Sequence, residues 1–318
     1  FGARIAAACD RAGIRCEPVV FAGEITEDEV MRLTALVRAL DVDFVIGAGG
    51  GKGIDAGKGV AHLLNKRIVT LPTAASNDAP TSKIYVLYDH THRIVRVGHM
   101  PANPDVVVVD TQAIAAAPLR MFTAGIGDAV SKKFEVAQAI ASGGANMFGG
   151  AACRAAAALA DLCYDSLRER GAKALADVRA KRVSDDLEAV IEATVLHSGL
   201  GFESGGLSVA HAMTRGLSAV RGARDCLHGH QVAYGLLVQL TLEGRSSDFI
   251  DDMRAFYRTV ELPTRLAQLD LADAADEDIA TIANRTMTAA YIRNFERPLS
   301  EGDVAAAIRS LEARAPSA

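Results

Sequence analysis

The chain has 318 residues, of which half are hydrophobic and 5% aromatic, with no tryptophan and a net charge of −5. This length favours two domains with a large core, and the negative charge argues against a nucleic-acid partner. The five cysteines form no CxxC pair, and their odd number indicates free thiols in a reducing compartment. Because no apolar run reaches the roughly 18 residues of a membrane span and no signal peptide is visible, we expect a cytoplasmic protein.

The first predicted elements are a helix over residues 1–12, a strand over 16–21 and a helix over 27–40. Thr26 and Glu29 have the spacing of a capping box at the start of the second helix. A doubly wound sheet normally opens with a strand, whereas this chain begins with Phe1 in a helical segment. We therefore expect that the first strands of the domain are absent from this chain.

The stretch 42–58, VDFVIGAGGGKGIDAGK, predicts a buried parallel strand, a glycine turn and a helix. Such a turn presents backbone N–H groups and a helix N-terminus to an anion. Gly47 and Gly49 begin a dinucleotide fingerprint, but Gly51 and Lys52 depart from it, and Gly59 stands where a phosphate-binding loop has Ser or Thr. The stretch is thus compatible with a nucleotide-binding turn and with a tight turn that binds nothing.

The following elements complete the domain organisation. We predict a strand over 67–71, a hairpin of 83–89 and 93–98 around the turn 90–92, and a final buried strand over 106–110. The alternation of helices and strands predicts a parallel α/β domain over residues 1–117. Beyond it, helical apolar spacing at 151–171, 185–199, 228–243 and 275–290 predicts an all-helical domain over 118–318. Ligands usually bind in the cleft between two such domains.

Three polar residues stand out in the helical half. Asp128 lies among small residues in AGIGDA, His211 ends the segment GGLSVAH, and His228 begins HGH. One carboxylate and two imidazoles form a donor set for a catalytic divalent metal with one open position. A lone histidine on a helix is, however, more often structural, and Asp128 is also compatible with a buried helix cap. Taken alone, the residues leave both interpretations open.

His230 competes with His228 for the role of a ligand. Two residues apart on a helix, the two side chains point in different directions, so we expect only one of them to reach a shared metal. The other histidines form no spacing pattern, and we interpret them as surface or packing residues: His62, His90, His92, His99 and His197.

Several motifs together resemble the glycerol dehydrogenase family, which belongs to the iron-containing or group III alcohol dehydrogenase superfamily. They are GGGKGID at 49–55, PTAASNDAP at 72–80, NPDVVVVD at 103–110, GIGD at 125–128, SGLGFESGG at 198–206 and His228-Gly229. The match runs in order from the first helix to the C-terminus. It implies a Rossmann-like α/β domain that binds NAD, followed by an all-helical domain, in the dehydroquinate synthase-like fold. It also implies a zinc-dependent, NAD-linked oxidation of glycerol to dihydroxyacetone by a cytoplasmic homo-oligomer, an octamer in the family.

The resemblance also implies site residues. The zinc ligands of the family fall on Asp128, His211 and His228, and the aspartate that hydrogen-bonds glycerol falls on Asp78. The family's NAD phosphate contacts fall on Gly50, Gly51, Lys52, Gly53 and Asp55, and its further cofactor contacts on Thr73, Ser76, Ser82, Ile84 and Tyr88.

The chain departs from the family pattern at several positions. His230 stands where the family usually has Glu, and Asn77 replaces the commoner Thr. Lys132 follows Asp128 by one helical turn, at the position of a fourth ligand, a His, in the iron enzymes. Because Lys is a poor ligand while it is protonated, we expect a three-ligand zinc site rather than iron. The strand that holds the adenosine ribose has no counterpart here, so NAD rather than NADP rests on the family alone.

Three alternatives remain at this stage. A glycerol-1-phosphate dehydrogenase-like enzyme has the same zinc set but needs cations for its phosphate, for which Lys83, Lys132 and Lys133 are the local candidates. A 3-dehydroquinate synthase-like enzyme, which uses NAD transiently, needs a richer cluster of Lys and Arg around the metal. The third alternative is a nucleotide-binding protein without catalytic activity.

Overall fold

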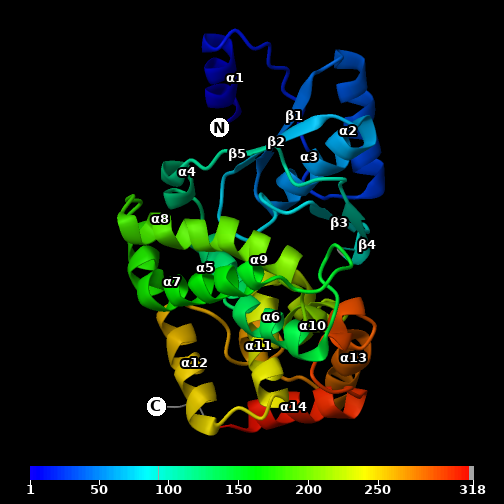
Figure 1. The fold of residues 1–318 in the computed structure, drawn as a ribbon, viewed down its shortest axis with the longest axis vertical. Coiled ribbons are helices and arrows are strands. Elements are labelled where there is room, and N and C mark those ends of the chain that lie inside the picture. Colours follow the sequence, from blue (N-terminus) through cyan, green and yellow to red (C-terminus); the bar gives the residue numbers. More distant parts are fainter. Residues whose placement is uncertain (92, 315–318) are drawn as a thin grey trace.

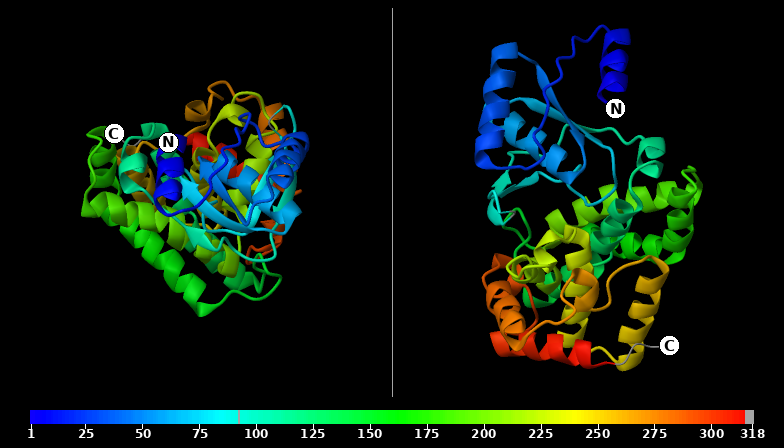
Figure 2. Two further views of the ribbon diagram at one scale, coloured as in Figure 1. Left: turned by 90° about the horizontal axis from the view of Figure 1, so that it is seen from above. Right: turned by 180° about the vertical axis from the view of Figure 1, so that it is seen from behind.

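The computed structural model describes residues 1–91 and 93–314, and it has an α/β part next to a larger helical part (Figure 1). The elements of the α/β part are α1 Gly2–Arg11, α2 Glu27–Leu40, β1 Phe44–Gly49, α3 Gly51–Leu64, β2 Arg67–Pro72, β3 Ile84–Tyr88, β4 Ile94–His99 and β5 Val106–Val107. The rear view shows the helix α1 at the far end of this part, joined to it by an extended segment (Figure 2).

The rest of the described chain is helical, as predicted. Its α-helices are α4 Thr111–Ala115, α5 Leu119–Ala129, α6 Lys132–Ser142, α7 Arg154–Arg179, α8 Asp185–Glu192, α9 Ser198–Gly205, α10 Val209–Leu217, α11 His228–Leu242, α12 Ser247–Thr259, α13 Asp276–Thr286 and α14 Glu301–Ala313, and short 3-10 helices lie at Ala223–Asp225, Leu266–Leu269 and Ala290–Arg293. A π-helical turn, Ala193–His197, joins α8 to α9, so the predicted helix over 185–199 is continuous but locally widened. The expected domain boundary between residues 117 and 118 stays a prediction.

The main sheet is parallel, in the order β1-β2-β5. β1 and β2 pair over their whole length, from Phe44 opposite Arg67 to Gly49 opposite Pro72. The predicted hairpin is confirmed, because β3 and β4 form an antiparallel pair. In the turn between them, His92 lies outside the described residues.

Two strand predictions were wrong in part or in whole. Residues 16–21 form no strand, because their backbone does not pair with the sheet. Val19 and Phe21 instead pack as side chains on the core of the α/β part. The predicted buried strand over 106–110 shrinks to the two residues of β5 at the sheet edge. Val106 in this strand is 48% exposed, and Val108 just after it is 43% exposed.

The start of α2 shows one half of the predicted capping box. The Thr26 hydroxyl accepts a hydrogen bond from the Glu29 N–H at 3.2 Å, which satisfies one of the free donors of the first turn. The Glu29 carboxylate does not return to Thr26. It accepts the N–H of Ala22 at 2.8 Å and pairs with Arg32 at 2.7 Å, so it fixes the segment before the helix.

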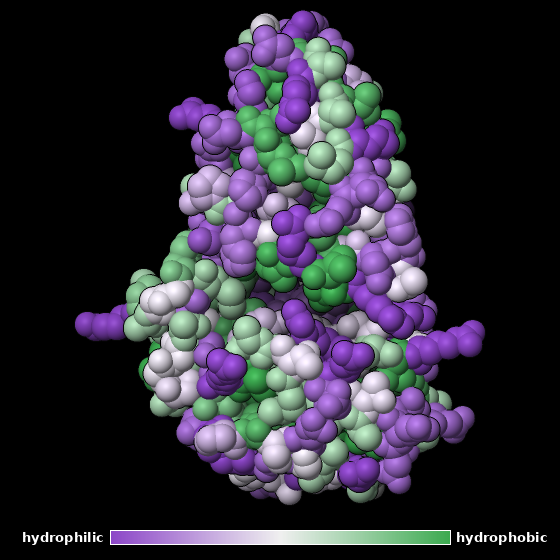
Figure 3. All heavy atoms as spheres, turned by 90° about the vertical axis from the view of Figure 1, so that its right-hand side faces the viewer, coloured by the Kyte–Doolittle hydropathy of each residue, from purple (hydrophilic) through white to green (hydrophobic). Residues whose placement is uncertain are grey.

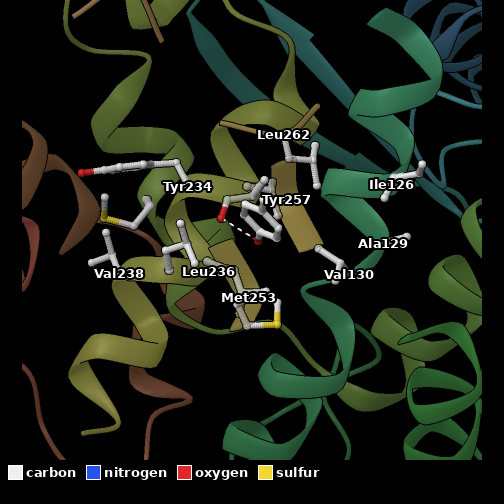
Figure 4. Close-up of a cluster of buried hydrophobic side chains, with 14 of the residues drawn as sticks. Ile126, Ala129, Val130, Tyr234, Leu236, Val238, Met253, Tyr257 and Leu262 are labelled. Atoms are coloured by element: carbon white, nitrogen blue, oxygen red, sulfur yellow. Dashed lines mark hydrogen bonds between the residues drawn. The ribbon is translucent and has the colours of Figure 1, made fainter. Parts of the chain in front are cut away.

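The hydrophobic core consists of two clusters. The smaller one joins α2, α3 and the hairpin through residues such as Val30, Val60 and Leu87. The larger one fills the helical part, and Figure 4 shows a section of it between α5, α11 and α12. There the buried hydroxyl of Tyr257 donates to the Ala233 carbonyl at 2.9 Å, so its polar atom is satisfied inside the apolar packing.

The face of the molecule shown in Figure 3 is not divided into a hydrophilic and a hydrophobic half. Hydrophilic and hydrophobic residues are interspersed over the face shown in Figure 3. Within the described residues, none of the helices combines the length and the apolar character needed to cross a bilayer.

Candidate active site

Glycines let three segments of the chain approach one another closely. A Cβ on Gly229 of α11 would lie 1.7 Å from the Ala124 carbonyl oxygen of α5, so the two helix backbones touch at this crossing. A Cβ on Gly125 would lie 1.9 Å from the carbonyl oxygen of Ala75, in the loop after β2. A side chain at either position would push the segments apart. The two glycines therefore allow the close packing that brings Asp128, His228 and Asp78 near one another.

The three residues implied as metal ligands come together in the structure. One ligand atom each of Asp128, His211 and His228 lies within 4.8 Å of the others, and we call this group the metal cluster. The Asp128 Oδ1 atom is 3.1 Å from His211 Nε2 and 4.0 Å from His228 Nε2. Asp128 and His211 are buried, whereas 38% of the His228 side chain is exposed. The cluster therefore has one open side.

Glu135, which no motif in the sequence singled out, orients His211. Its Oε2 atom lies 2.6 Å from Nδ1 of His211, and its Oε1 atom accepts the His211 N–H at 2.9 Å. An imidazole that donates Nδ1–H to a carboxylate presents the lone pair of Nε2 on its other side, as metal-bound histidines do. One signal was available in the sequence: Asp128, Lys132 and Glu135 follow an i, i+4, i+7 spacing, which places them on one helical face.

Lys132 lies inside the metal cluster rather than beside it. Its ammonium is 2.8 Å from Asp128 Oδ1 and 3.0 Å from His211 Nε2. It also pairs with Asp78 Oδ2 at 3.1 Å, and its side chain is 1% exposed. The nitrogen further lies 5.1 Å from the centre of the Phe202 ring, a cation–π distance. Two buried carboxylates thus share one buried cation.

The charges of this group shift one another's pKa values. Burial alone raises the pKa of Asp128, but the Lys132 ammonium and the His211 ring outweigh it, and the pKa lies well below its usual value. Burial likewise raises the pKa of Glu135, yet His211 and Lys132 lower it on balance. Desolvation lowers the pKa of His228 to about 4. At neutral pH the cluster therefore presents a carboxylate and a neutral His228 imidazole.

The donor set fits a divalent metal ion. Two imidazoles and one carboxylate are the ligands of many catalytic zinc sites, and Glu135 fixes the tautomer that His211 needs. His228, uncharged at neutral pH, retains a lone pair. Lys132 departs from such a site, because its ammonium contacts Asp128 Oδ1 and His211 Nε2, the same atoms that would bind the metal.

Two further predicted residues lie around the cluster. The Asp78 carboxylate is buried and accepts the Ser198 hydroxyl at 2.7 Å. His230 points elsewhere: its Nε2 atom is 2.9 Å from the Thr123 hydroxyl of α5, and it is not a member of the metal cluster. His228 alone of this pair belongs to the metal cluster, and its role as the ligand stays a prediction.

The predicted glycine turn is present between β1 and α3. Gly50 caps α3, and a Cβ there would meet no atom within 4 Å, whereas a Cβ on Gly51 would meet the Asn77 side chain, so the N-terminus of the helix is open at Gly50 and bordered by Asn77. A Cβ on Gly57 would lie 2.6 Å from the Gly47 Cα atom, which shows how tightly α3 packs on β1. An open helix N-terminus after a parallel strand is an anion-binding arrangement. The helix begins at Gly51, earlier than the predicted start near Ile54.

Two of the residues predicted to contact NAD at this turn, Lys52 and Asp55, already bind other groups of the protein. Lys52 forms an ion pair with Glu24 at 2.7 Å. Asp55 is buried, accepts the Val86 N–H at 2.9 Å and lies 3.6 Å from the ammonium of Lys58, so it ties α3 to the hairpin. A carboxylate repels phosphate, and this position suits a structural role for Asp55. Its contact with the cofactor stays a prediction.

The second group of predicted cofactor residues lies at the ends of β2 and β3. The Thr73 N–H donates to the Gly49 carbonyl at 2.9 Å, which joins the loop after β2 to the glycine turn. Lys58 donates to the Ser82 hydroxyl at 3.2 Å and to the Ile84 carbonyl at 2.7 Å. Ser76 is half-buried in the same loop, and the Tyr88 ring lies 5.8 Å from the Lys52 ammonium.

A cavity of about 760 Å³ adjoins the glycine turn. It lies between α1, the segment after it, α2 and β1, and its lining includes Gly49, Gly53 and Thr73. None of the metal cluster residues lines it. The cavity is therefore part of the α/β side of the molecule.

Comparison with known proteins gives one consistent family. Residues 2–111 match the family model described as iron-containing alcohol dehydrogenase. The chain is 40% identical to a glycerol dehydrogenase of Thermotoga maritima, over 94% of this chain and 82% of that protein. It is 41% identical to a glycolaldehyde reductase of Halobacterium salinarum, over 86% and 74%. The crystal structure of glycerol dehydrogenase from Schizosaccharomyces pombe superposes with a TM-score of 0.92 at 32% identity, over 98% of this chain and 79% of that one.

Proposed function

This chain belongs to the glycerol dehydrogenase family of the iron-containing alcohol dehydrogenases, and we propose that it catalyses the reversible, NAD-linked oxidation of glycerol to dihydroxyacetone with zinc as its metal. The observation that carries the proposal is the metal cluster of Asp128, His211 and His228. It comes from three separate helices and has the donor set of a catalytic zinc site. Donors that include two imidazoles suit zinc better than magnesium or calcium.

In this proposal the metal cluster and Asp78 bind the metal and the polyol, and the glycine turn of the α/β part binds NAD. Asp128, His211 and His228 would hold zinc, which when bound supplies a Lewis acid that stabilises negative charge on the substrate oxygen. The Asp78 carboxylate, which accepts the Ser198 hydroxyl at 2.7 Å, would accept a hydrogen bond from a hydroxyl of the polyol. The glycine turn would bind the NAD phosphates through its backbone N–H groups. NAD supplies the acceptor of the hydride.

The lysines near the site favour an unphosphorylated substrate. Lys132 is committed to Asp128 and Asp78, and Lys133 pairs with Asp161 at 3.1 Å. Lys83 lies over the Phe148 ring, 4.1 Å from its centre. These three candidates therefore do not converge on one phosphate position, which disfavours the glycerol-1-phosphate and 3-dehydroquinate synthase-like alternatives.

The test is the absorbance of NADH at 340 nm when the chain is mixed with zinc, NAD and glycerol. We expect steady accumulation of NADH, and none when glycerol is replaced by glycerol 1-phosphate or by the substrate of 3-dehydroquinate synthase. A reverse assay with NADH compares dihydroxyacetone with glycolaldehyde, because one relative is a glycolaldehyde reductase. A higher kcat/KM for glycolaldehyde than for dihydroxyacetone would mean that glycolaldehyde, and not the glycerol–dihydroxyacetone pair, is the substrate. No turnover of either compound would reject the proposed function.

The location and assembly of the protein are part of the same proposal. We expect a cytoplasmic homo-oligomer that acts on a small polyol. Size-exclusion chromatography with light scattering measures the assembly directly, and a monomer at micromolar concentration would contradict that expectation.

A further inference from the structure

Two atoms of the metal cluster lie beside a single cation. Glu135 engages Nδ1 of His211 at 2.6 Å, so in the neutral ring Nε2 carries the lone pair, and this atom lies 3.1 Å from Asp128 Oδ1. Two acceptors so close together repel each other unless a positive charge lies between or beside them. In the structure that charge is the ammonium of Lys132, 2.8 Å from the oxygen and 3.0 Å from the nitrogen.

A metal ion needs a lone pair from each of these two atoms. Zinc binds carboxylate oxygen and imidazole nitrogen at about 2.0–2.2 Å. The single lone pair of His211 Nε2 cannot coordinate zinc and at the same time accept the hydrogen bond from Lys132, which lies 3.0 Å away. An ammonium and a divalent cation at that spacing would also repel each other strongly, because the site is buried. The Lys132 contacts and a full set of metal bonds therefore exclude each other.

We propose that Lys132 is a built-in competitor of the metal: its ammonium fills the cation position of the cluster and must leave Asp128 and His211 before a divalent ion binds. This inference rests on the proposed function in so far as it takes the cluster to be a metal site. Lys132 thereby sets the metal affinity and keeps the metal-free protein electrically balanced. The residue is a positioning and regulatory element of the site and not a ligand.

The structure also gives the displaced ammonium another partner. Asp78 Oδ2 lies 3.1 Å from Lys132 Nζ, and Asp78 belongs to the loop after β2 rather than to the metal cluster. A small movement of the Lys132 side chain toward Asp78 therefore frees the two lone pairs without leaving the ammonium unpaired in a buried site. Because Asp78 is also the residue proposed to bind the polyol, metal loading and substrate binding are expected to be linked through Lys132.

The test compares zinc affinities of the full-length protein and two variants. Lys132→Ala removes the competing ammonium. Lys133→Ala is the matched control, since Lys133 pairs with Asp161 near the surface and not with the metal cluster. Zinc is titrated into metal-free protein against a chelator of known affinity. We expect Lys132→Ala to bind zinc on the order of 100-fold more tightly than the original chain, and Lys133→Ala to bind it as the original does. Equal affinities of all three proteins would overturn the proposal.

Thermal unfolding gives a second readout. Without metal, Lys132→Ala leaves Asp128 and Asp78 buried without their cation, so we expect a lower Tm than for the original chain and a larger rise on adding zinc. Should this variant need metal to fold, refolding yields in zinc and in EDTA give the same comparison. Recovery that depends on zinc supports the proposal, whereas an identical response to zinc in variant and original overturns it.

The outcomes separate this inference from the proposed function. Tighter zinc binding by Lys132→Ala in a protein that does not oxidise glycerol would reject the function and support the competition. Zinc-dependent oxidation of glycerol with equal affinities in all three proteins would reject the competition and support the function. Oxidation of glycerol by the original chain without bound metal, together with tighter zinc binding by Lys132→Ala, would support the competition and remove zinc from the proposed function.

Discussion

The carboxylate of Glu135 lies 2.6 Å from Nδ1 of His211 and holds the ring with Nε2 toward Asp128. Glu135→Gln keeps the size of the side chain but places a neutral amide against Nδ1. Because loss of such a partner weakens the orientation and basicity of a ligand, we expect zinc affinity to fall about 10–100-fold. The control is Glu192→Gln, at a half-exposed carboxylate that pairs with His197. Unchanged affinity in Glu135→Gln would show that His211 is not a ligand.

The pair of histidines on α11 makes the next prediction. His230 bonds to Thr123 at 2.9 Å, and a residue two positions from His228 is turned by about 200° around the helix. His230→Gln should therefore leave zinc affinity nearly unchanged, whereas His228→Gln should abolish tight binding. Both variants are measured in the same metal titration. The reverse order would mean that His230 is the ligand of the pair.

Asp78 is expected to act on the polyol rather than on the cofactor. Asp78→Ala removes an acceptor that Ser198 holds in place at 2.7 Å, and a hydrogen bond to a charged group contributes about 1.5–3 kcal/mol. We therefore expect the KM for glycerol to rise about 10–100-fold and the KM for NAD to change little. Asp161→Ala, at an exposed carboxylate, serves as the control. Equal increases in both KM values would indicate a structural role for Asp78.

The helix crossing at Gly229 is expected to be intolerant of any side chain. In Gly229→Ala the new Cβ would lie 1.7 Å from the Ala124 carbonyl oxygen, so α5 and α11 must separate. We expect the free energy of unfolding to fall by about 3 kcal/mol or more, together with loss of metal affinity. Gly302→Ala, near the start of α14, meets nothing closer than 3.6 Å and should be neutral or slightly stabilising. Urea denaturation of both variants tests this difference.

Asp55 makes a prediction about pH. Burial, opposed in part by Lys58, raises its pKa from 3.8 to about 6 in the folded protein. A carboxyl group with a raised folded pKa stabilises the fold below its unfolded pKa, and this contribution is lost as the pH rises through the folded pKa. From pH 4 to pH 7 the loss amounts to about 3 kcal/mol at most. The stability of the original chain relative to Asp55→Asn should therefore fall over this range in denaturation measured at each pH. A constant difference would contradict the shifted pKa.

Local patterns in the sequence were sufficient for the order and type of most elements. The apolar run before the glycines predicted β1, and helical spacing predicted the helical part, because these features depend on neighbouring residues. The strand over 16–21 was wrong because a strand also needs a partner for its backbone, which sequence periodicity does not reveal. The final strand was predicted as buried on its valines alone, although its position at the sheet edge leaves them exposed.

For the site, motifs in the sequence singled out Asp128, His211 and His228, and the family resemblance implied that they share a metal. The groups that surround these three residues depend on tertiary packing and are not visible in the sequence. Glu135 and Lys132 acquire their roles from ring orientation and from distances of 2.6 to 3.1 Å, which depend on how α5, α6 and α10 pack. Lys132 was recognised in the sequence as a poor ligand, but its place among the ligands follows from burial, since a buried carboxylate pair requires a cation within reach.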